Sequence, residues 1–147
     1  MKLCMIGTGY VGLVSGVCFS DLGNTVYCVD NNKNKIDLLN NGKVPIYEPG
    51  LEEILKKNYK EKRLIFTTDL KKAVLNSDII FICVGTPTLK NSDSADLKYV
   101  FNVAKQLKKL ISRYKIIVTK STVPVCTGDK IEKILNNLIN KNIVDVV

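Results

Sequence analysis

Short apolar runs alternate with longer amphipathic segments along the whole of this chain. The runs are rich in Val, Ile and Leu, and they occupy residues 2–6, 25–29, 64–67, 79–84, 115–119 and 143–147. Such runs are typical of strands in a parallel sheet whose two faces are both covered. The segments between them place apolar residues three and four positions apart, which predicts helices at 13–22, 32–40, 51–59, 69–75, 96–112 and 127–140.

Strands and helices that alternate in this way predict an α/β protein with a doubly wound parallel sheet, the Rossmann arrangement. We expect about six strands in the order 3-2-1-4-5-6, with helices on both faces. The unbroken apolar run at 79–84 is expected to be a central strand buried on both sides. No repeat, low-complexity tract or linker interrupts the pattern, so residues 1–147 are interpreted as one domain, with a polar loop at 90–94.

A glycine-rich turn, Gly-Thr-Gly-Tyr-Val-Gly at 7–12, joins the first predicted strand to the first predicted helix. In this setting Gly7 allows a tight turn, Gly9 lets the backbone approach a pyrophosphate, and Gly12 lets the helix pack against the sheet. The phosphates then sit at the helix N-terminus, where free N–H groups and the positive end of the dipole favour an anion. The turn therefore predicts a dinucleotide-binding site.

An acidic residue stands where a ribose-binding carboxylate is expected. Asp30 ends the second predicted strand, eighteen residues after Gly12, close to the roughly 20 residues of the dinucleotide fingerprint. A carboxylate there accepts hydrogen bonds from the adenosine ribose and repels a 2′-phosphate, which favours NAD over NADP. Lys35 follows closely enough to leave that preference open.

Polar loops follow the fourth and fifth predicted strands, at 85–88 and 120–127. Ligands of open α/β sheets bind outside the carboxyl ends of the strands, so these loops are expected to flank the nicotinamide half of the dinucleotide. Thr86, Ser121 and Thr122 supply hydroxyl groups there. Each loop by itself is equally an ordinary polar turn, but all of them converge on the same edge as the glycine-rich turn.

The composition is that of a folded globular domain: 46% of the 147 residues are hydrophobic and 24% are charged. No apolar run reaches the roughly 18 residues of a membrane span. The N-terminus carries one lysine and then enters a strand, without the apolar core or cleavage site of a signal peptide. We therefore expect a cytoplasmic protein with no membrane partner.

The chain has five cysteines and no histidine. Cys4, Cys28 and Cys83 fall in predicted core strands and no C-x-x-C pair occurs, so reduced thiols that pack as small apolar side chains are expected. Without histidine, the commonest metal ligand and general base is missing. This argues against a metal site and against Ser-His or Cys-His catalysis.

A net charge of +8 is a feature shared with many nucleic-acid-binding proteins. Here the lysines are dispersed, apart from pairs at 56–57, 71–72 and 108–109 that fit solvated helix faces. We therefore expect no nucleic-acid partner. The positive field is instead expected to help attract an anionic dinucleotide or nucleotide sugar.

Six segments of the chain carry a more specific signal. They are Gly-Thr-Gly-Tyr-Val-Gly-Leu at 7–13, Pro-Ile-Tyr-Glu-Pro-Gly-Leu at 45–51, Phe-Thr-Thr-Asp-Leu at 66–70, Val-Gly-Thr-Pro at 84–87, Ser-Ala-Asp-Leu at 94–97 and Lys-Ser-Thr-Val-Pro-Val at 120–125. In this order they resemble the NAD-binding domain of the UDP-glucose/GDP-mannose dehydrogenase family, over nearly the whole chain. The amino-acid sequences of the first and last segments favour the UDP-glucose branch of the family.

The resemblance implies oxidation of the C6 alcohol of UDP-glucose to the carboxylate of UDP-glucuronate in two NAD-dependent steps, through an aldehyde held on a catalytic cysteine. By position, Tyr10 and Val11 are expected to contact the pyrophosphate, and Thr122 has a supporting catalytic role because its hydroxyl helps to hold a water near the reaction centre. The full predicted cofactor-binding set is Gly7, Gly9, Tyr10, Val11, Gly12, Asp30, Lys35, Val84, Thr86, Ser121 and Thr122.

The resemblance also implies parts that this sequence does not contain. An Asn-Pro-Glu-Phe-Leu segment with the catalytic glutamate is expected just after Val147, and the active-site lysine, the nucleophilic cysteine and the sugar-binding domain further on. We therefore expect a cut domain that binds NAD without turnover, from an enzyme that forms a homodimer. One departure stands out: Cys126 occupies a position where the family usually has glycine, and its side chain is expected to affect the turn into the next helix.

Two other interpretations remain open at this stage. A GDP-mannose or UDP-N-acetyl sugar dehydrogenase of the same family would have the same cofactor-binding segments. A stand-alone NAD-sensing module would bind the dinucleotide and catalyse no reaction. The first differs from the UDP-glucose interpretation in its sugar contacts, and the second in the sequence expected after residue 147.

Overall fold

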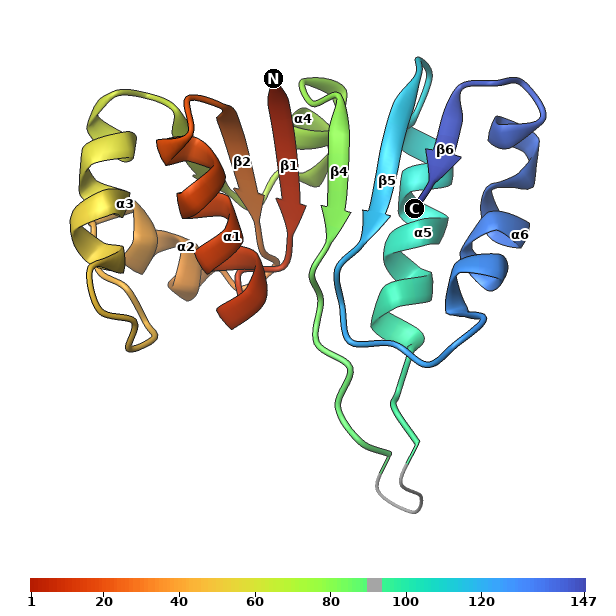
Figure 1. Cartoon of the computed structure of the whole chain (residues 1–147), viewed down its shortest axis with the longest axis horizontal. Coiled ribbons are helices and arrows are strands. Elements are labelled where there is room, and N and C mark those ends of the chain that lie inside the picture. The colour runs from red at the N-terminus through yellow and green to blue at the C-terminus, as the bar shows by residue number, and fades with distance from the viewer. Residues whose placement is uncertain (90–93) are drawn as a thin grey trace.

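The computed structural model describes residues 1–89 and 94–147, and in these residues the predicted alternation of strands and helices is confirmed (Figure 1). Of the polar loop predicted at 90–94, only Ser94 lies within the described residues. The strands are β1 (Lys2–Ile6), β2 (Thr25–Val29), β3 (Leu64–Thr67), β4 (Ile79–Ile82), β5 (Lys115–Thr119) and β6 (Val144–Val146). The helices are α1 (Tyr10–Asp21), α2 (Lys33–Asn40), α3 (Leu51–Lys60), α4 (Leu70–Leu75), α5 (Lys98–Leu110) and α6 (Thr127–Ile139).

The strands form one parallel sheet in the order β3-β2-β1-β4-β5-β6, as predicted. The order reverses between β1 and β4, which pair directly from Leu3 opposite Ile79 to Ile6 opposite Ile82. All six strands therefore end at the same edge, which is the lower edge in Figure 1. The loops that leave β1 and β4 diverge there, and this divergence is where open sheets of this kind form ligand sites.

Two hydrophobic clusters cover the two faces of the sheet. Successive residues of β1 alternate between them: Leu3 and Met5 belong to one cluster, and Cys4 and Ile6 to the other. The first cluster contains residues of α1, α2 and α3, and the second contains residues of α4, α5 and α6. The alternation follows from the two-residue period of a strand, and it places helices on both faces.

Several element ends differ from the predicted ones. The helix predicted at 13–22 begins earlier, at Tyr10, because the glycine-rich turn leads directly into it with Gly9 as the N-cap. The strand predicted at 79–84 ends at Ile82. Within it Ile80 and Ile82 are buried, whereas Ile79 and Phe81 are half-buried, so that burial on both faces is less complete than expected.

At two of the remaining ends, a polar side chain just outside the helix accepts a hydrogen bond from its first turn. Asn32 is the N-cap of α2 and accepts a hydrogen bond from the backbone of Lys35 at 3.1 Å. The helix predicted at 96–112 is shorter because Asp96 accepts from the backbone N–H of Lys98 and stays outside it. The elements predicted at 51–59, 127–140 and 143–147 are Leu51–Lys60, Thr127–Ile139 and Val144–Val146.

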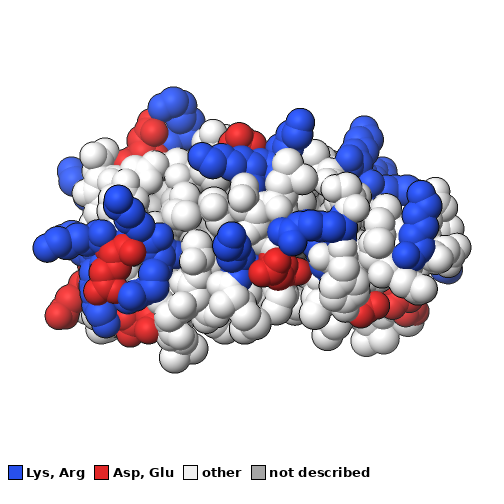
Figure 2. All heavy atoms as spheres, turned by 90° about the horizontal axis from the view of Figure 1, so that it is seen from above, with Lys and Arg blue, Asp and Glu red and all other residues white. Residues whose placement is uncertain are grey.

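Charged side chains are mixed on the face at the amino ends of the strands, opposite the edge where the strands end. Figure 2 shows Lys and Arg spread over this face with Asp and Glu among them. Arg113 lies 3.6 Å from Asp78, and the hydroxyl of Tyr114 donates to Asp145 at 2.5 Å. The dispersed lysines thus fit the solvated faces inferred from the sequence. Within the residues that the structure describes, no helix is long and apolar enough to cross a membrane.

Cys126 is the N-cap of α6 and adopts a left-handed backbone conformation, with φ 65° and ψ 10°. A Cβ atom strains this conformation, which explains in physical terms why glycine suits the position. We expect Cys126→Gly to raise the free energy of unfolding by about 1 kcal/mol, measured by urea denaturation. Cys126→Ala is the control, because it removes the thiol and keeps the Cβ. An equal gain in both variants would contradict the strain.

Candidate functional site

The turn after β1 is built on Gly7. Its φ is +103°, and its backbone N–H donates to the carbonyl of Val29 at 2.7 Å, which ties the turn to the end of β2. A Cβ at this position would lie 2.6 Å from the carbonyl oxygen of Cys83. Both the backbone conformation and the space therefore require glycine. The tight turn predicted from the sequence is present.

Gly12 lies in the first turn of α1 and is buried against the glycine-rich turn itself. A Cβ there would lie 1.9 Å from the carbonyl oxygen of Gly7 and 2.9 Å from the Cβ of Cys83. The close approach is thus to the turn and to the residue after β4. The helix also packs closely against the sheet at Gly16, where a Cβ would lie 2.6 Å from the sulfur of Cys28 on β2.

Gly9 differs from both, because a Cβ built on it meets no protein atom within 4 Å. Its φ of −70° is open to any residue, and it is exposed at the N-terminus of α1. Neither backbone strain nor packing in this chain demands glycine here. The first turn of α1 also carries no acidic side chain. What the position offers is an open backbone surface at the positive end of a helix, as an approaching anion requires.

Asp30 follows β2 and holds the centre of a hydrogen-bond network. Its Oδ2 accepts from the backbone N–H of Thr8 at 3.0 Å, from the hydroxyl of Thr8 at 2.7 Å and from Lys35 Nζ at 3.2 Å. Its Oδ1 accepts from the backbone N–H of Asn32 at 3.0 Å. The side chain of Asp30 is 11% exposed and that of Lys35 is 30% exposed. The ribose-binding candidates predicted from the sequence are therefore an ion pair beside the glycine-rich turn.

The network keeps Asp30 ionised. Burial by itself raises the pKa of this carboxyl, but the hydrogen bonds from Asn32, Thr8 and Lys35 together outweigh burial and hold the pKa below its ordinary value. A charged carboxylate at the end of β2 is the form that accepts hydrogen bonds from ribose hydroxyls. It is also the form that repels a phosphate on the same sugar.

A cavity of about 750 Å³ opens at the carboxyl edge of the sheet, between the glycine-rich turn, the ends of β2 and β4, and α5. It brings together five of the predicted residues, namely Gly7, Gly9, Asp30, Lys35 and Val84. Six predicted residues do not line it, namely Tyr10, Val11, Gly12, Thr86, Ser121 and Thr122. The cavity thus contains both the glycine-rich turn and Asp30, which the sequence analysis identified from two separate signals.

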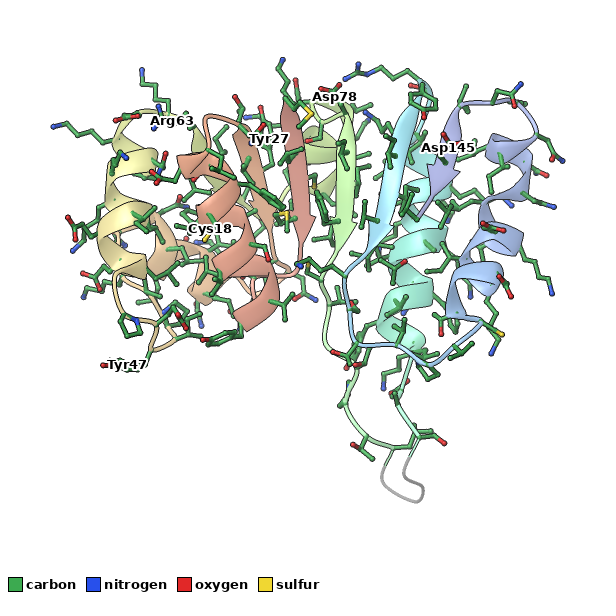
Figure 3. The ribbon with its side chains drawn as sticks, viewed as in Figure 1. Cys18, Tyr27, Tyr47, Arg63, Asp78 and Asp145 are labelled. Atoms are coloured by element: carbon green, nitrogen blue, oxygen red, sulfur yellow. The ribbon has the colours of Figure 1, made fainter. Side chains whose placement is uncertain are left out.

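Tyr10 and Val11 begin α1 beside the cavity, and both side chains are exposed. The hydroxyl of Tyr10 donates to the carboxylate of Glu48, in the loop between α2 and α3. This contact draws the loop toward the start of α1. The neighbouring Tyr47 projects into solvent at the same end of the molecule, whereas Arg63 and Asp78 lie at the opposite end (Figure 3).

Thr86, Ser121 and Thr122 bind the loops after β4 and β5 to each other. The hydroxyl of Thr86 donates to the backbone carbonyl of Thr122 at 2.9 Å. The hydroxyl of Ser121 donates to the carbonyl of Val84 at 2.7 Å and approaches that of Ile82 at 3.2 Å. The hydroxyls of Thr86 and Ser121 are therefore committed to the backbone, while the Thr122 side chain is exposed.

Sequence reasoning missed the wall of the cavity that α5 supplies. Tyr99, Asn102 and Gln106 line it, together with Val103, from this one helix. Tyr99, Asn102 and Gln106 are three and four residues apart, so they lie along one side of α5, next to its apolar stripe. Most other polar residues of this helix are lysines. This uncharged polar stripe was the available signal. Asn31 after β2, Thr68 after β3 and Leu70 at the start of α4 also line the cavity.

The profile of the UDP-glucose/GDP-mannose dehydrogenase family, NAD binding domain, matches residues 1–147. The UDP-glucose 6-dehydrogenase of Rhizobium meliloti is 51% identical over 135 residues, which are 92% of this chain and 31% of that protein. UDP-glucose 6-dehydrogenase TuaD of Bacillus subtilis is 52% identical over 134 residues, 91% of this chain and 29% of that protein. The chain thus spans about a third of the length of these relatives.

Among solved structures, a ternary complex of GDP-mannose dehydrogenase from Pseudomonas aeruginosa superimposes with a TM-score of 0.93. It is 40% identical, and the match covers 99% of this chain and 35% of that one. The structural match thus covers nearly the whole chain, and the family profile spans all of it. This chain belongs to the UDP-glucose/GDP-mannose dehydrogenase family and is its NAD-binding domain.

Proposed function

We propose that NAD lies across the carboxyl edge of the sheet, with its pyrophosphate over Gly9 at the start of α1 and its adenosine ribose on Asp30. The observation that carries this proposal is that one cavity holds both the open backbone at Gly9 and the ionised carboxylate. The free N–H groups of the first turn of α1 and the side chain of Asp30 would thus serve the two polar parts of one ligand. NAD supplies the hydride acceptor when bound.

We assign the adenine end to the part of the cavity between Thr68 and α5, and the nicotinamide end to the loops after β4 and β5. Asn102 and Gln106 offer amide groups at the adenine end, and Leu70 and Val103 offer apolar surface. At the other end, the bond between Thr86 and the backbone of Thr122 holds the two loops together. The roles predicted for Thr86, Ser121 and Thr122 stay predictions.

The pairing of Lys35 with Asp30 favours NAD over NADP. The sequence left this preference open, because a lysine close to the ribose site can also bind a 2′-phosphate. Here Lys35 Nζ lies 3.2 Å from the carboxylate, so that its charge is already matched. A phosphate placed beside this pair would meet the negative charge of Asp30 as well.

The complete enzyme that contains this domain is proposed to oxidise UDP-glucose to UDP-glucuronate in two NAD-dependent steps. Identities of 51% and 52% to UDP-glucose 6-dehydrogenases support this substrate. The high structural similarity to a GDP-mannose dehydrogenase, at 40% identity, makes GDP-mannose the second candidate. The chain alone is proposed to bind NAD without turnover. Cytoplasmic location and a homodimeric complete enzyme also remain proposals.

A calorimetric titration of the 147-residue chain with NAD tests the cofactor site. Asp30→Ala is expected to weaken binding by about 1.5–3 kcal/mol, the worth of a charge-assisted hydrogen bond. Asp37→Ala is the matched control, because Asp37 is an exposed carboxylate on α2 that pairs only with Lys33 at 2.6 Å among the described residues. Equal affinities of the wild type and both variants would refute the role of Asp30.

The substrate is tested by measuring NADH production by the complete gene product with UDP-glucose, GDP-mannose and a UDP-N-acetyl sugar. The proposal predicts the highest kcat/KM with UDP-glucose. A preference for GDP-mannose would select the second candidate. NAD binding without turnover of any nucleotide sugar would favour a sensing module, and steady NADH production by the 147-residue chain would contradict its proposed inactivity.

A further inference from the structure

Thr8 occupies the variable position between the first two glycines of the turn, yet it is almost completely buried, with 1% of its surface exposed. Both of its polar donors reach the same atom. Its backbone N–H lies 3.0 Å from Asp30 Oδ2 and its hydroxyl 2.7 Å from that oxygen. The contact joins the end of β1 to the end of β2, across 22 residues of sequence. Thr8 therefore ties the pyrophosphate loop to the ribose carboxylate.

The hydrogen bonds divide the two oxygens of Asp30 between protein and ligand. An ionised carboxylate is acceptor-only, with about four lone-pair positions in all. Oδ2 already accepts from both donors of Thr8 and from Lys35 Nζ. Oδ1 accepts only from the backbone of Asn32 among the described residues. Oδ1 is therefore the oxygen with an acceptor position left for a ribose hydroxyl.

We propose that Thr8 is a specificity-determining positioning residue: its buried hydroxyl anchors Oδ2 of Asp30, presents Oδ1 to the adenosine ribose, and thereby selects NAD over NADP. This proposal rests on the proposed binding of the adenosine ribose at Asp30. Thr8 itself acts through the carboxylate. Its hydroxyl is the shortest of the contacts to Oδ2, and its burial leaves it little freedom to serve any other partner.

The physical consequence is a fixed negative charge at one point of the site. Without the hydroxyl, Oδ2 keeps one backbone donor and the mobile ammonium of Lys35, so the carboxylate is free to turn toward that lysine. Hydrogen bonds to ribose then cost the ordering of the Asp30 side chain. Repulsion of a 2′-phosphate falls at the same time, because the charge no longer stays beside the sugar. A loop that was merely loosened would weaken both cofactors alike.

The test compares NADH and NADPH binding to the 147-residue chain by fluorescence titration, with Thr8→Val and Thr8→Ser. Valine keeps the volume and loses the hydroxyl, whereas serine keeps the hydroxyl. We expect Thr8→Val to raise the Kd for NADH about tenfold, as for one lost charge-assisted hydrogen bond, and to leave the Kd for NADPH within about twofold. Thr8→Ser retains the selectivity of the wild type. In an Asp30→Asn background, Thr8→Val leaves the selectivity unchanged.

An equal loss of NADH and NADPH affinity in Thr8→Val, or no loss, would overturn the selection by Thr8 while leaving the cofactor site in place. Absence of NADH binding to the wild-type chain would overturn the proposed function itself, and cofactor selection with it. The anchor is also measured without ligand, by urea unfolding of Thr8→Val, Asp30→Asn and the double variant. We expect the double variant to lose less stability than the sum of the losses in the two single variants. Losses that add exactly would refute the proposed contact between Thr8 and Asp30 as an anchor.

Discussion

Replacing Gly12 with alanine is expected to destabilise the domain by about 3 kcal/mol or more, the upper range for overpacking. The added methyl group would lie 1.9 Å from the carbonyl oxygen of Gly7 and 2.9 Å from the Cβ of Cys83. Both neighbours are held in place, since Gly7 donates to Val29 and Cys83 donates to Ile6 through their backbones. Relief therefore requires movement of the turn or of the end of β4. Urea denaturation followed by circular dichroism measures the loss.

Two other glycines provide matched controls for the same added methyl group. Gly128, in the first turn of α6, has open space around its Cβ position, so Gly128→Ala is expected to leave the stability unchanged or raise it. Gly9→Ala is also expected to leave the fold intact, but to weaken NAD binding at least about tenfold because the methyl group occupies the approach to the turn. Unchanged NAD affinity in Gly9→Ala would contradict the pyrophosphate position.

Raising the pH above 9 is expected to lower the free energy of unfolding steeply, by about 3–4 kcal/mol per pH unit. Burial raises the pKa of Cys4 and of Cys83 to about 12, from the ordinary value of 9.0, and raises that of Cys28 further. Below pH 9 the three thiols are protonated in the folded and the unfolded state, so their contribution to the free energy of unfolding is fully present. Above it the unfolded chain loses protons that the folded chain keeps, so stability falls until the folded thiols ionise.

One buried group acts in the opposite direction. Burial, with a smaller effect of Arg113, lowers the pKa of Lys115, which is fully buried and donates to the carbonyl of Ser77. Between the lowered pKa of the folded state and pH 10.5, the unfolded state binds a proton that the folded state lacks, so this lysine makes stability rise with pH in that range. Its opposing slope is at most about 1.4 kcal/mol per pH unit, against about 4 for the three thiols together. The net effect is therefore a loss.

The measurement is a series of urea unfolding curves between pH 8 and pH 11, with a reductant present. Cys28→Ala is expected to reduce the slope of stability against pH by about 1.4 kcal/mol per unit, because one buried thiol is removed. Cys18→Ala is the control, since Cys18 is exposed on α1. The burial of the thiols would not explain alkaline unfolding if both variants kept the slope of the wild type.

The local features of the cofactor site were predictable because they depend on short stretches of chain. A strand, a glycine-rich turn and a helix succeed one another within 2–21, and their periods of two and 3.6 residues are visible in the sequence. The position of Asp30 at the end of β2 follows from the same reasoning. The alternation of strands and helices, with right-handed crossovers and the doubly wound arrangement, also predicts the strand order. Cys126 has the left-handed backbone conformation that glycine adopts most easily, in agreement with the glycine expected there from the family resemblance.

Only the tertiary structure decided which polar groups are committed to other protein groups and which line the cavity. Tyr10 and Glu48 are 38 residues apart, Thr86 and Thr122 are 36 apart, and their contacts have no local signature. The stripe on α5 becomes a cavity wall because the sheet order places that helix beside the end of β4.

Thr8 shows the same division within one motif. Its position in the glycine-rich turn is variable in the dinucleotide fingerprint, so the sequence predicts no role for it. Folding brings β1 and β2 side by side, and the ends of these strands place the hydroxyl 2.7 Å from Asp30 Oδ2. Periodicity thus determined the elements and the edge where the site lies, because both are local. The partners of each hydroxyl and carboxylate were decided by contacts between strands that are distant in the sequence.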